Sequence, residues 1–357
     1  MSSKKTVSDQ HLPDASSHAT PDLRRRKFTA ALTTGILVGP AILSLPARAA
    51  EFNLKLANNA PTTYPTNVRA RQAADRIRKA TNGEVNIQIF PNNQLGGDPD
   101  MFAQVRSGAI DAYMVPGLLA QSAVADAGIH CLAFAFKNYD AVWAGIDGDL
   151  GAHIRKSILK AGIHTMPRAW DNGFRQISSR DKPVRGPDDL NGFKIRTPAF
   201  PMIVSIFESL GAAPTAINIK ETYAALQTRL ADGQENPTLL LEVLKFHEVQ
   251  KHCSITNHVW DGFWPGFNVK TWEKLPSQVQ KIIEDNFNQS GTDQRGDIAA
   301  MEKRTQSELE KKGVTFTQAD QQAFRERLRK VGYYDKWQKS FSPEAWGLLE
   351  KYAGKLA

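Results

Sequence analysis

Two hydrophobic periodicities alternate along the chain after its first fifty residues, and this alternation restricts the possible folds more than any other feature of the sequence. A two-residue period predicts strands over residues 52–57 and 84–90, and a helical period predicts a helix over 66–81 between them. A helix over 98–107 and a strand over 109–115 continue the series. Alternating strands and helices are typical of an α/β layer fold.

A second series of the same kind follows after Gly162. Strands are predicted over 163–170, 175–179 and 193–197, and helices over 201–210 and 220–229. A chain of 357 residues exceeds the size that one hydrophobic core comfortably supports, so two domains are expected.

The last part of the chain is strongly helical and charged. A helical pattern covers 277–312, with interruptions expected at Gly291 and Gly296, and two more helices are expected over 318–331 and 343–355. One long helix here could brace both domains, and two separate surface helices are the alternative.

The N-terminal segment resembles a twin-arginine export signal. Arg25 and Arg26 precede a mildly apolar stretch over residues 30–45, and small residues follow at 47–49. The stretch is short for a membrane span, so cleavage near Ala49 or Ala50 is favoured over an uncleaved anchor. The mature protein is then expected in the periplasm.

The charge of the chain argues against a nucleic-acid-binding protein. The formal net charge is +8, and residues 1–50 carry seven cations and three acids. The remaining 38 cations and 34 acids contain no long basic run, which is compatible with small anionic ligands but not with a nucleic-acid footprint.

No sequence motif indicates an enzyme. The nucleophile elbow, the phosphate-binding loop, the dinucleotide-binding glycine pattern and the zinc-protease helix motif are all missing. The acids at helix starts are assigned to caps: Asp98 is predicted as the N-cap before Pro99, and Asp188 and Asp189 as a second helix start.

Neither a cofactor nor a metal is expected. His247, His252, Cys253 and His258 match no compact ligand spacing. Cys131 is far from Cys253 in the sequence, so unpaired buried thiols are favoured, although an oxidising compartment permits a bridge.

Polar residues recur at the ends of the predicted strands in the second half. Trp170, Asn172 and Arg175 fall within six positions, Arg196 ends the strand over 193–197, and Asn236 precedes Pro237. Arginine binds a carboxylate through two parallel hydrogen bonds, so a cleft lined by these residues would suit an organic anion.

Several linked segments resemble the solute-binding proteins of TRAP transporters, the DctP family. They read NGFRQISS, GFKIRTP, LGAAPTAINIKETYAALQTRLADGQENP and FHEVQKHCSITNH, and the resemblance extends over essentially the whole mature chain. It implies an α/β, two-lobe, periplasmic-binding-protein-like fold (type II-like) with a long C-terminal bracing helix. It also implies a protein that is not an enzyme and that delivers a small organic acid to a TRAP membrane permease. The protein is expected to be a monomer.

The resemblance also suggests lobe boundaries. The export signal would cover residues 1–50, lobe I would consist of 51–172 and 262–300, and lobe II of 173–261 and 301–357.

Residue roles follow from the same resemblance. Arg196 would clamp the ligand carboxylate, Arg175 would be a second arginine in the cleft, and Asn236 would hydrogen-bond the same end of the ligand. Structural alternatives stay open: a surface charge or an ion pair for Arg196, a buried acid partner for Arg175, and a turn for Asn236.

Aromatic residues near these segments favour a monocarboxylate with an apolar or aromatic body. Trp170, Phe200, Trp260 and Phe263 are the expected contacts. From the first lobe, the expected contacts are Asn59 and Met114. A hydroxy acid, a 2-oxo acid or a uronate is the alternative ligand, and an exported enzyme or sensor subunit that reuses the fold is the alternative function.

Overall fold

The computed structural model describes residues 50–356, which belong to one compact unit. The expected export signal over 1–50 therefore lies almost entirely outside the described residues.

The first end of the sheet is parallel. Strand β1 (Phe52–Ala57) pairs with β2 (Val85–Phe90) and with β3 (Ala112–Pro116). Helices α1 (Pro65–Ala80) and α2 (Asp98–Ser107) make the connections, as the alternating periodicities predict. A parallel pair requires such a crossover, which explains why helices separate these strands in the sequence.

Two long antiparallel strands occupy the centre. Strand β9 (His252–Asn268) runs beside β3, β5 (Trp170–Ser179) and the short β4 (Ile163–Thr165). The strand predicted over 163–170 is thus two strands, and Pro167, which has no backbone N–H, lies between them.

The second end of the same sheet contains β8 (Gly233–Pro237), β6 (Lys194–Thr197) and β7 (Ala213–Ala216). The strand order is β2-β1-β3-β9-β5-β8-β6-β7, and β10 (Thr315–Gln318) pairs with β9. Strands β5 and β9 therefore connect the two ends of one continuous sheet.

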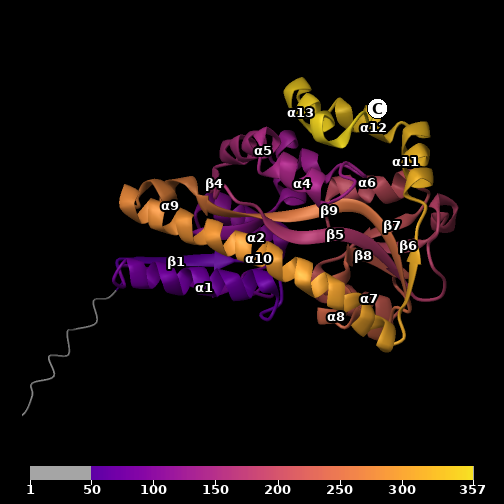
Figure 1. The fold of residues 1–357 in the computed structure, drawn as a ribbon, viewed down its shortest axis with the longest axis horizontal. Coiled ribbons are helices and arrows are strands. Elements are labelled where there is room, and N and C mark those ends of the chain that lie inside the picture. The colour runs from indigo at the N-terminus through magenta and orange to yellow at the C-terminus, as the bar shows by residue number, and fades with distance from the viewer. Residues whose placement is uncertain (1–49, 357) are drawn as a thin grey trace, which may run out of the picture. The chain divides into compact units, whose positions relative to one another are not determined.

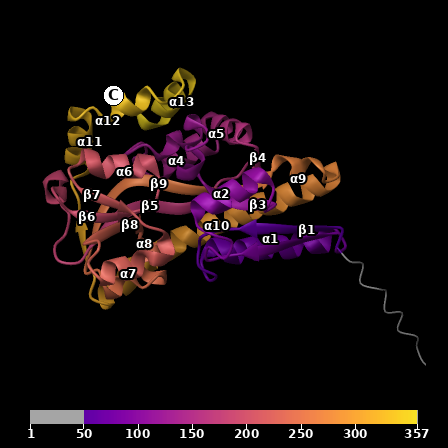
Figure 2. The ribbon, with the colours of Figure 1, turned by 180° about the vertical axis from the view of Figure 1, so that it is seen from behind.

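Helices cover the central strands on two sides. In both ribbon views α4, α5 and α6 lie above β5 and β9, whereas α1, α7 and α8 lie below them (Figures 1 and 2). The remaining bounds are α3 Gly117–Ala120, α4 Tyr139–Ile146, α5 Asp149–Lys160, α6 Pro201–Ser209, α7 Thr222–Gln227, α8 Thr238–Val243, α9 Val269–Glu273, α11 Gln321–Lys330, α12 Tyr333–Gln338 and α13 Pro343–Ala353. Short 3-10 helices are η1 Ala125–Cys131, η2 Pro187–Leu190, η3 Ile219–Glu221 and η4 Phe246–Glu248.

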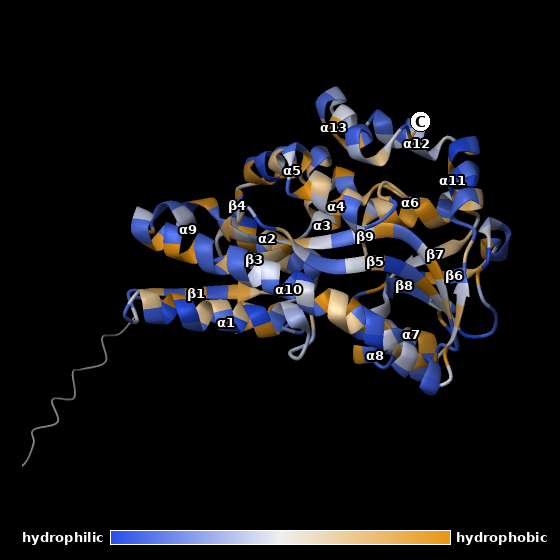
Figure 3. Ribbon diagram, viewed as in Figure 1, coloured by the Kyte–Doolittle hydropathy of each residue, from blue (hydrophilic) through white to orange (hydrophobic). Residues whose placement is uncertain are grey.

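One 35-residue helix, α10 (Ser277–Lys311), crosses the molecule and packs against α1, α8 and β5. Figure 3 shows mixed polar and apolar residues along this helix, as expected for a helix with one buried side. The side chain of Gln294 accepts a hydrogen bond from the backbone N–H of Asp171 (2.8 Å) and donates one to its carbonyl (2.6 Å). The expected long bracing helix is present.

The interruptions expected at Gly291 and Gly296 do not occur, because α10 is continuous through both. Gly291 instead permits a close approach to β5. A Cβ atom at this position would lie 2.7 Å from Trp170 Nε1, whereas a Cβ at Gly296 would meet nothing within 4 Å.

Other findings concern the part of the chain that the structure describes. Cys131 and Cys253 are both free and buried. Within residues 50–356, no helix combines the length and apolarity that a membrane span requires. No group of three or more His, Cys, Asp or Glu side chains in these residues is arranged to hold a metal ion.

Gly291 and Gly296 make a matched test of the packing of α10. We expect Gly291→Ala to lower the free energy of unfolding by about 1–3 kcal/mol, because the new methyl group collides with a buried indole. Gly296→Ala should raise it by about 0.5–1 kcal/mol, because alanine favours the helix and the site is open. Urea unfolding of both variants measures the difference, and similar effects at both positions would contradict the packing of α10 on Trp170.

Candidate ligand-binding pocket

One pocket lies between the first end of the sheet, the second end and the central strands, with an empty volume of about 520 Å³. The pocket is lined by Asn59, Ala60, Pro61, Tyr64, Asp98, Pro116, Asn172, Arg175, Arg196, Pro198, Phe200, Ile219, Asn236, Leu240, Leu244, Asp261 and Phe263.

The structure brings six of the nine predicted site residues to this pocket. They are Arg196, Arg175, Asn236, Phe200, Phe263 and Asn59. Trp170, Trp260 and Met114 are not among its lining residues and are buried in apolar clusters instead.

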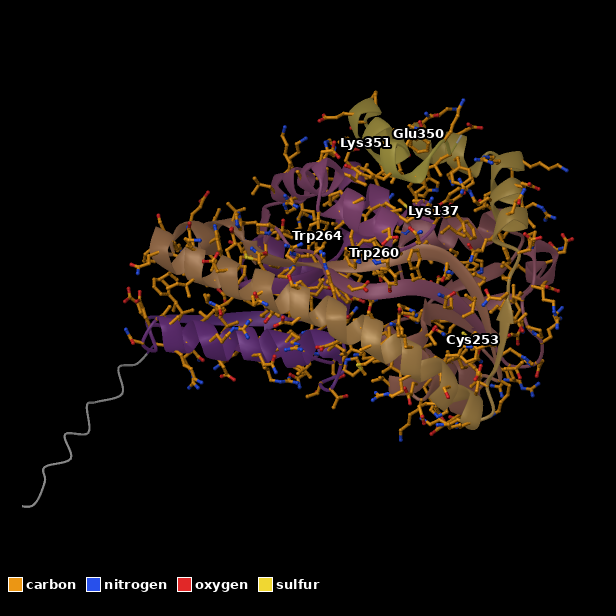
Figure 4. All side chains as sticks on the ribbon, in the orientation of Figure 1. Lys137, Cys253, Trp260, Trp264, Glu350 and Lys351 are labelled. Carbon is orange, nitrogen blue, oxygen red and sulfur yellow. The ribbon has the colours of Figure 1, made fainter. Side chains whose placement is uncertain are left out.

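The geometry of the strands explains these three differences. On β9, side chains alternate between faces, so Trp260 and Trp264 lie on the face opposite Asp261 and Phe263. Figure 4 labels Trp260 and Trp264 in the middle of the molecule. Trp170 packs against α10 at Gly291. Met114 lies two residues before Pro116, the residue of β3 that reaches the pocket.

Arg175 is held by two buried acids. Its Nε and Nη2 donate to Glu235 Oε2 (2.5 Å) and Oε1 (2.8 Å), and its Nη1 donates to Asp261 Oδ2 (2.8 Å). Burial disfavours the charged guanidinium, but Glu235 and Asp261 outweigh this effect and raise the pKa of Arg175 above its ordinary value. In this structure Arg175 therefore has the buried acid partners that the sequence analysis gave as the structural alternative to a role in ligand binding.

Arg196 has a different environment. Its Nε (2.8 Å) and Nη2 (2.6 Å) both donate to the carbonyl of Ile217, just after β7. Its Nη1 is buried without a hydrogen-bond partner, and no acid of the described residues lies within 4.0 Å of its guanidinium. Burial lowers the pKa of Arg196 to about 10, so it remains a cation at neutral pH.

Asn236 connects to the same network. Its Oδ1 accepts from Arg175 Nη2 (3.2 Å), and its Nδ2 donates to Gln234 Oε1 (2.5 Å). Behind it, the Nε2 of His258 lies 3.2 Å from Glu235 Oε2, and burial lowers the pKa of His258. The network therefore crosses β5, β8 and β9.

Three polar lining residues were not predicted from the sequence: Tyr64, Asp98 and Asp261. Asn172, which was grouped with Arg175 as a residue of the expected cleft, also lines the pocket. Asp261 is the one acidic residue in the aromatic segment VWDGFW, and an acid among aromatic residues was the sequence feature that could have indicated a site residue here.

The prediction that Asp98 is the N-cap of α2 is wrong. The N-cap is Gly97, whose N–H donates to Asp100 Oδ2 (2.9 Å). Asp98 Oδ1 instead accepts from the hydroxyl of Tyr113 (2.8 Å). Burial raises the pKa of Asp98, and the hydrogen bonds from Tyr113 and Asn59 oppose this rise.

Two hydrogen bonds join segments that flank the pocket. The hydroxyl of Tyr64, next to α1, donates to Asn172 Oδ1 on β5 (3.1 Å). Asn93, between β2 and α2, donates through Nδ2 to Asn218 Oδ1, which follows β7 (3.0 Å). Both ends of the sheet therefore contribute to the walls.

The contrast between the two arginines predicts different costs of removal. Arg175→Met should lower the free energy of unfolding by about 3–5 kcal/mol, because it leaves Glu235 and Asp261 as uncompensated buried charges. Arg196→Met should have a smaller effect, because no buried acid loses its partner. Urea unfolding without ligand measures both, and equal losses would contradict the different environments of the two groups.

Comparison with known proteins agrees with this architecture. The family model of DctP, described as bacterial extracellular solute-binding protein, family 7, matches residues 56–340. The C4-dicarboxylate-binding periplasmic protein DctP of Rhodobacter capsulatus is 32% identical over 274 residues, which cover 75% of this chain and 81% of that protein. The sialic acid-binding periplasmic protein SiaP of Vibrio cholerae is 29% identical over 293 residues, which cover 81% of this chain and 91% of that protein.

Solved structures show the same fold. A TRAP periplasmic solute-binding protein from Sulfitobacter sp. NAS-14.1 with bound β-D-galacturonate has a TM-score of 0.80 and 26% identity, and covers 85% of this chain and 100% of its own. A TRAP periplasmic solute-binding protein from Roseobacter denitrificans with bound L-galactonate has a TM-score of 0.78 and 26% identity, and the match covers 85% of this chain and 99% of that one. The two-lobe α/β fold expected from the sequence is confirmed by these matches. The chain belongs to the DctP family of TRAP transporter periplasmic solute-binding proteins, which bind solutes and are not enzymes.

Proposed function

We propose that this protein captures a small organic acid in the pocket, with Arg196 as the clamp for the ligand carboxylate, and delivers it to a TRAP membrane permease. The observation that supports this role is Arg196 Nη1, a buried cationic donor without a partner in the wall of the pocket. A buried charge without a partner is costly, and a bound carboxylate would supply the missing hydrogen bond and the opposite charge.

Arg175 has a supporting role in this proposal. Its Nε, Nη1 and Nη2 all donate to protein groups, so it contributes positive charge to the pocket but offers the ligand less than Arg196 does. It also positions Asn236, whose Oδ1 it binds.

The relatives support the ligand class and the location. Their names and bound molecules include a C4-dicarboxylate, sialic acid, galacturonate and galactonate, all of which carry a carboxylate. We further propose that the protein is exported to the periplasm and cleaved near Ala49 or Ala50. It acts as a monomer whose two lobes close on the ligand, lobe I being residues 51–172 and 262–300 and lobe II residues 173–261 and 301–357.

Calorimetric titration of the purified protein with a panel of sugar acids and other organic acids tests the clamp. Arg196→Met should weaken binding of every acid that binds the wild type by at least about 100-fold, because it removes charged hydrogen bonds from a buried site. Lys194→Met is the matched control, because Lys194 is an exposed cation on the same strand, and it should bind like the wild type. Unchanged binding by Arg196→Met, or no acid bound by the wild type, would contradict the proposal.

A further inference from the structure

The pocket contains a second buried polar atom without a partner, and it is an acceptor. Asp261 is 3% exposed. Its Oδ2 accepts from Arg175 Nη1 (2.8 Å) and from Asn172 Nδ2 (3.0 Å), whereas its Oδ1 is buried and accepts no hydrogen bond. The pocket wall therefore holds an unused cationic donor on Arg196 and an unused anionic acceptor on Asp261.

The two unused atoms require complementary groups on one ligand. A carboxylate satisfies Arg196 but cannot donate to Asp261, so a second ligand group must supply a hydrogen-bond donor. An apolar or aromatic body would leave Asp261 Oδ1 buried and unpaired, and sites built to bind a hydroxyl strongly reject analogues that lack it.

The side-chain amides nearby favour hydroxyl groups as these donors. Asn59, Asn172 and Asn236 line the same pocket, and each amide both donates and accepts. A hydroxyl group does the same, so a chain or ring of hydroxyls suits these neighbours. Of the four aromatic contacts expected for an aromatic ligand body, two are missing from the pocket, since Trp170 and Trp260 do not line it.

The charges of the site disfavour a second carboxylate. Two cations, Arg175 and Arg196, line the pocket together with two acids, Asp98 and Asp261. A third acid, Glu235, bonds Arg175. Glu235 and Asp261 already share Arg175, so Arg196 is the cation left for the ligand. A dicarboxylate would bring its second charge to a wall that carries Asp98 and Asp261.

We infer that Asp261 is a specificity-determining residue that accepts a hydrogen bond from a ligand hydroxyl, so that the pocket selects hydroxylated monocarboxylic acids and rejects dicarboxylates. The inference rests on the proposed function, because it takes the carboxylate on Arg196 as given. Burial raises the pKa of Asp261, although the adjacent Arg175 opposes this rise.

Matched ligand pairs test the inference by calorimetric titration. D-galacturonate and D-glucuronate are each compared with the dicarboxylate of the same carbon skeleton, galactarate and glucarate, and with hexanoate, which has no hydroxyl. The wild type should bind the better uronate at least about 100-fold more tightly than its dicarboxylate partner and than hexanoate.

Two variants separate the role of Asp261 from general effects of charge. Asp261→Asn should reduce the preference for uronate over dicarboxylate by at least about 10-fold, because the repulsion falls while an acceptor oxygen remains. Asp126→Asn is the matched control. Asp126 contacts His153 and Ser342, does not line the pocket, and should leave the preference unchanged.

Each outcome has a separate meaning. If the wild type binds a dicarboxylate or hexanoate as tightly as the uronates, or if Asp261→Asn keeps the wild-type preference, the inference is wrong although the clamp stands. If Asp261→Asn does not fold, the preference of the wild type decides alone. If no carboxylate binds the wild type, the proposed function fails together with the inference.

Discussion

The properties of the pocket depend on one buried ion network, in which Glu235 and Asp261 bind the guanidinium of Arg175. This network joins β8, at the second end of the sheet, to β5 and β9, the strands that connect the two ends. Because Arg175 takes both acids, Arg196 stays without an acid partner among the described residues. One arginine is thereby committed to the protein, and the other remains available to a ligand.

The surrounding scaffold keeps these groups in place. Arg196 is fixed by the carbonyl of Ile217, and α10 holds the backbone at Asp171 through Gln294, one residue from the pocket residue Asn172. Positioning groups before the ligand arrives reduces the entropy that binding must remove. A continuous α10 is important here, because its contact at Gly291 lies directly behind β5.

Much of the fold could be predicted from hydrophobic periodicity, because most helices and strands at the first end have one buried side. Periodicity did not reveal β9, since its 17 residues are almost entirely buried and do not alternate between polar and apolar. The pattern KIR shows a related limit: Lys194 and Arg196 share a face, but only Arg196 is covered by neighbouring segments. The local sequence does not contain that information, and the family resemblance supplied it.

Residues of the candidate site could be predicted only where the local sequence motif contains them. The arginine motifs identified Arg175 and Arg196, but their different partners depend on tertiary contacts across three strands. Asp98 followed the local rule for a helix cap, yet Gly97 caps the helix and Asp98 bonds Tyr113 in the pocket wall. Trp260, one of the expected aromatic contacts, does not line the pocket, because on β9 one step along the strand moves a side chain to the opposite face.

The most direct test of the central claim is a crystal structure with the tightest-binding acid from the titrations. We predict a ligand carboxylate oxygen about 3 Å from Arg196 Nη1, while Arg175 keeps its bonds to Glu235 and Asp261. A carboxylate bound to Arg175 or elsewhere, with Arg196 still bonded only to Ile217, would contradict the division of roles between the two arginines.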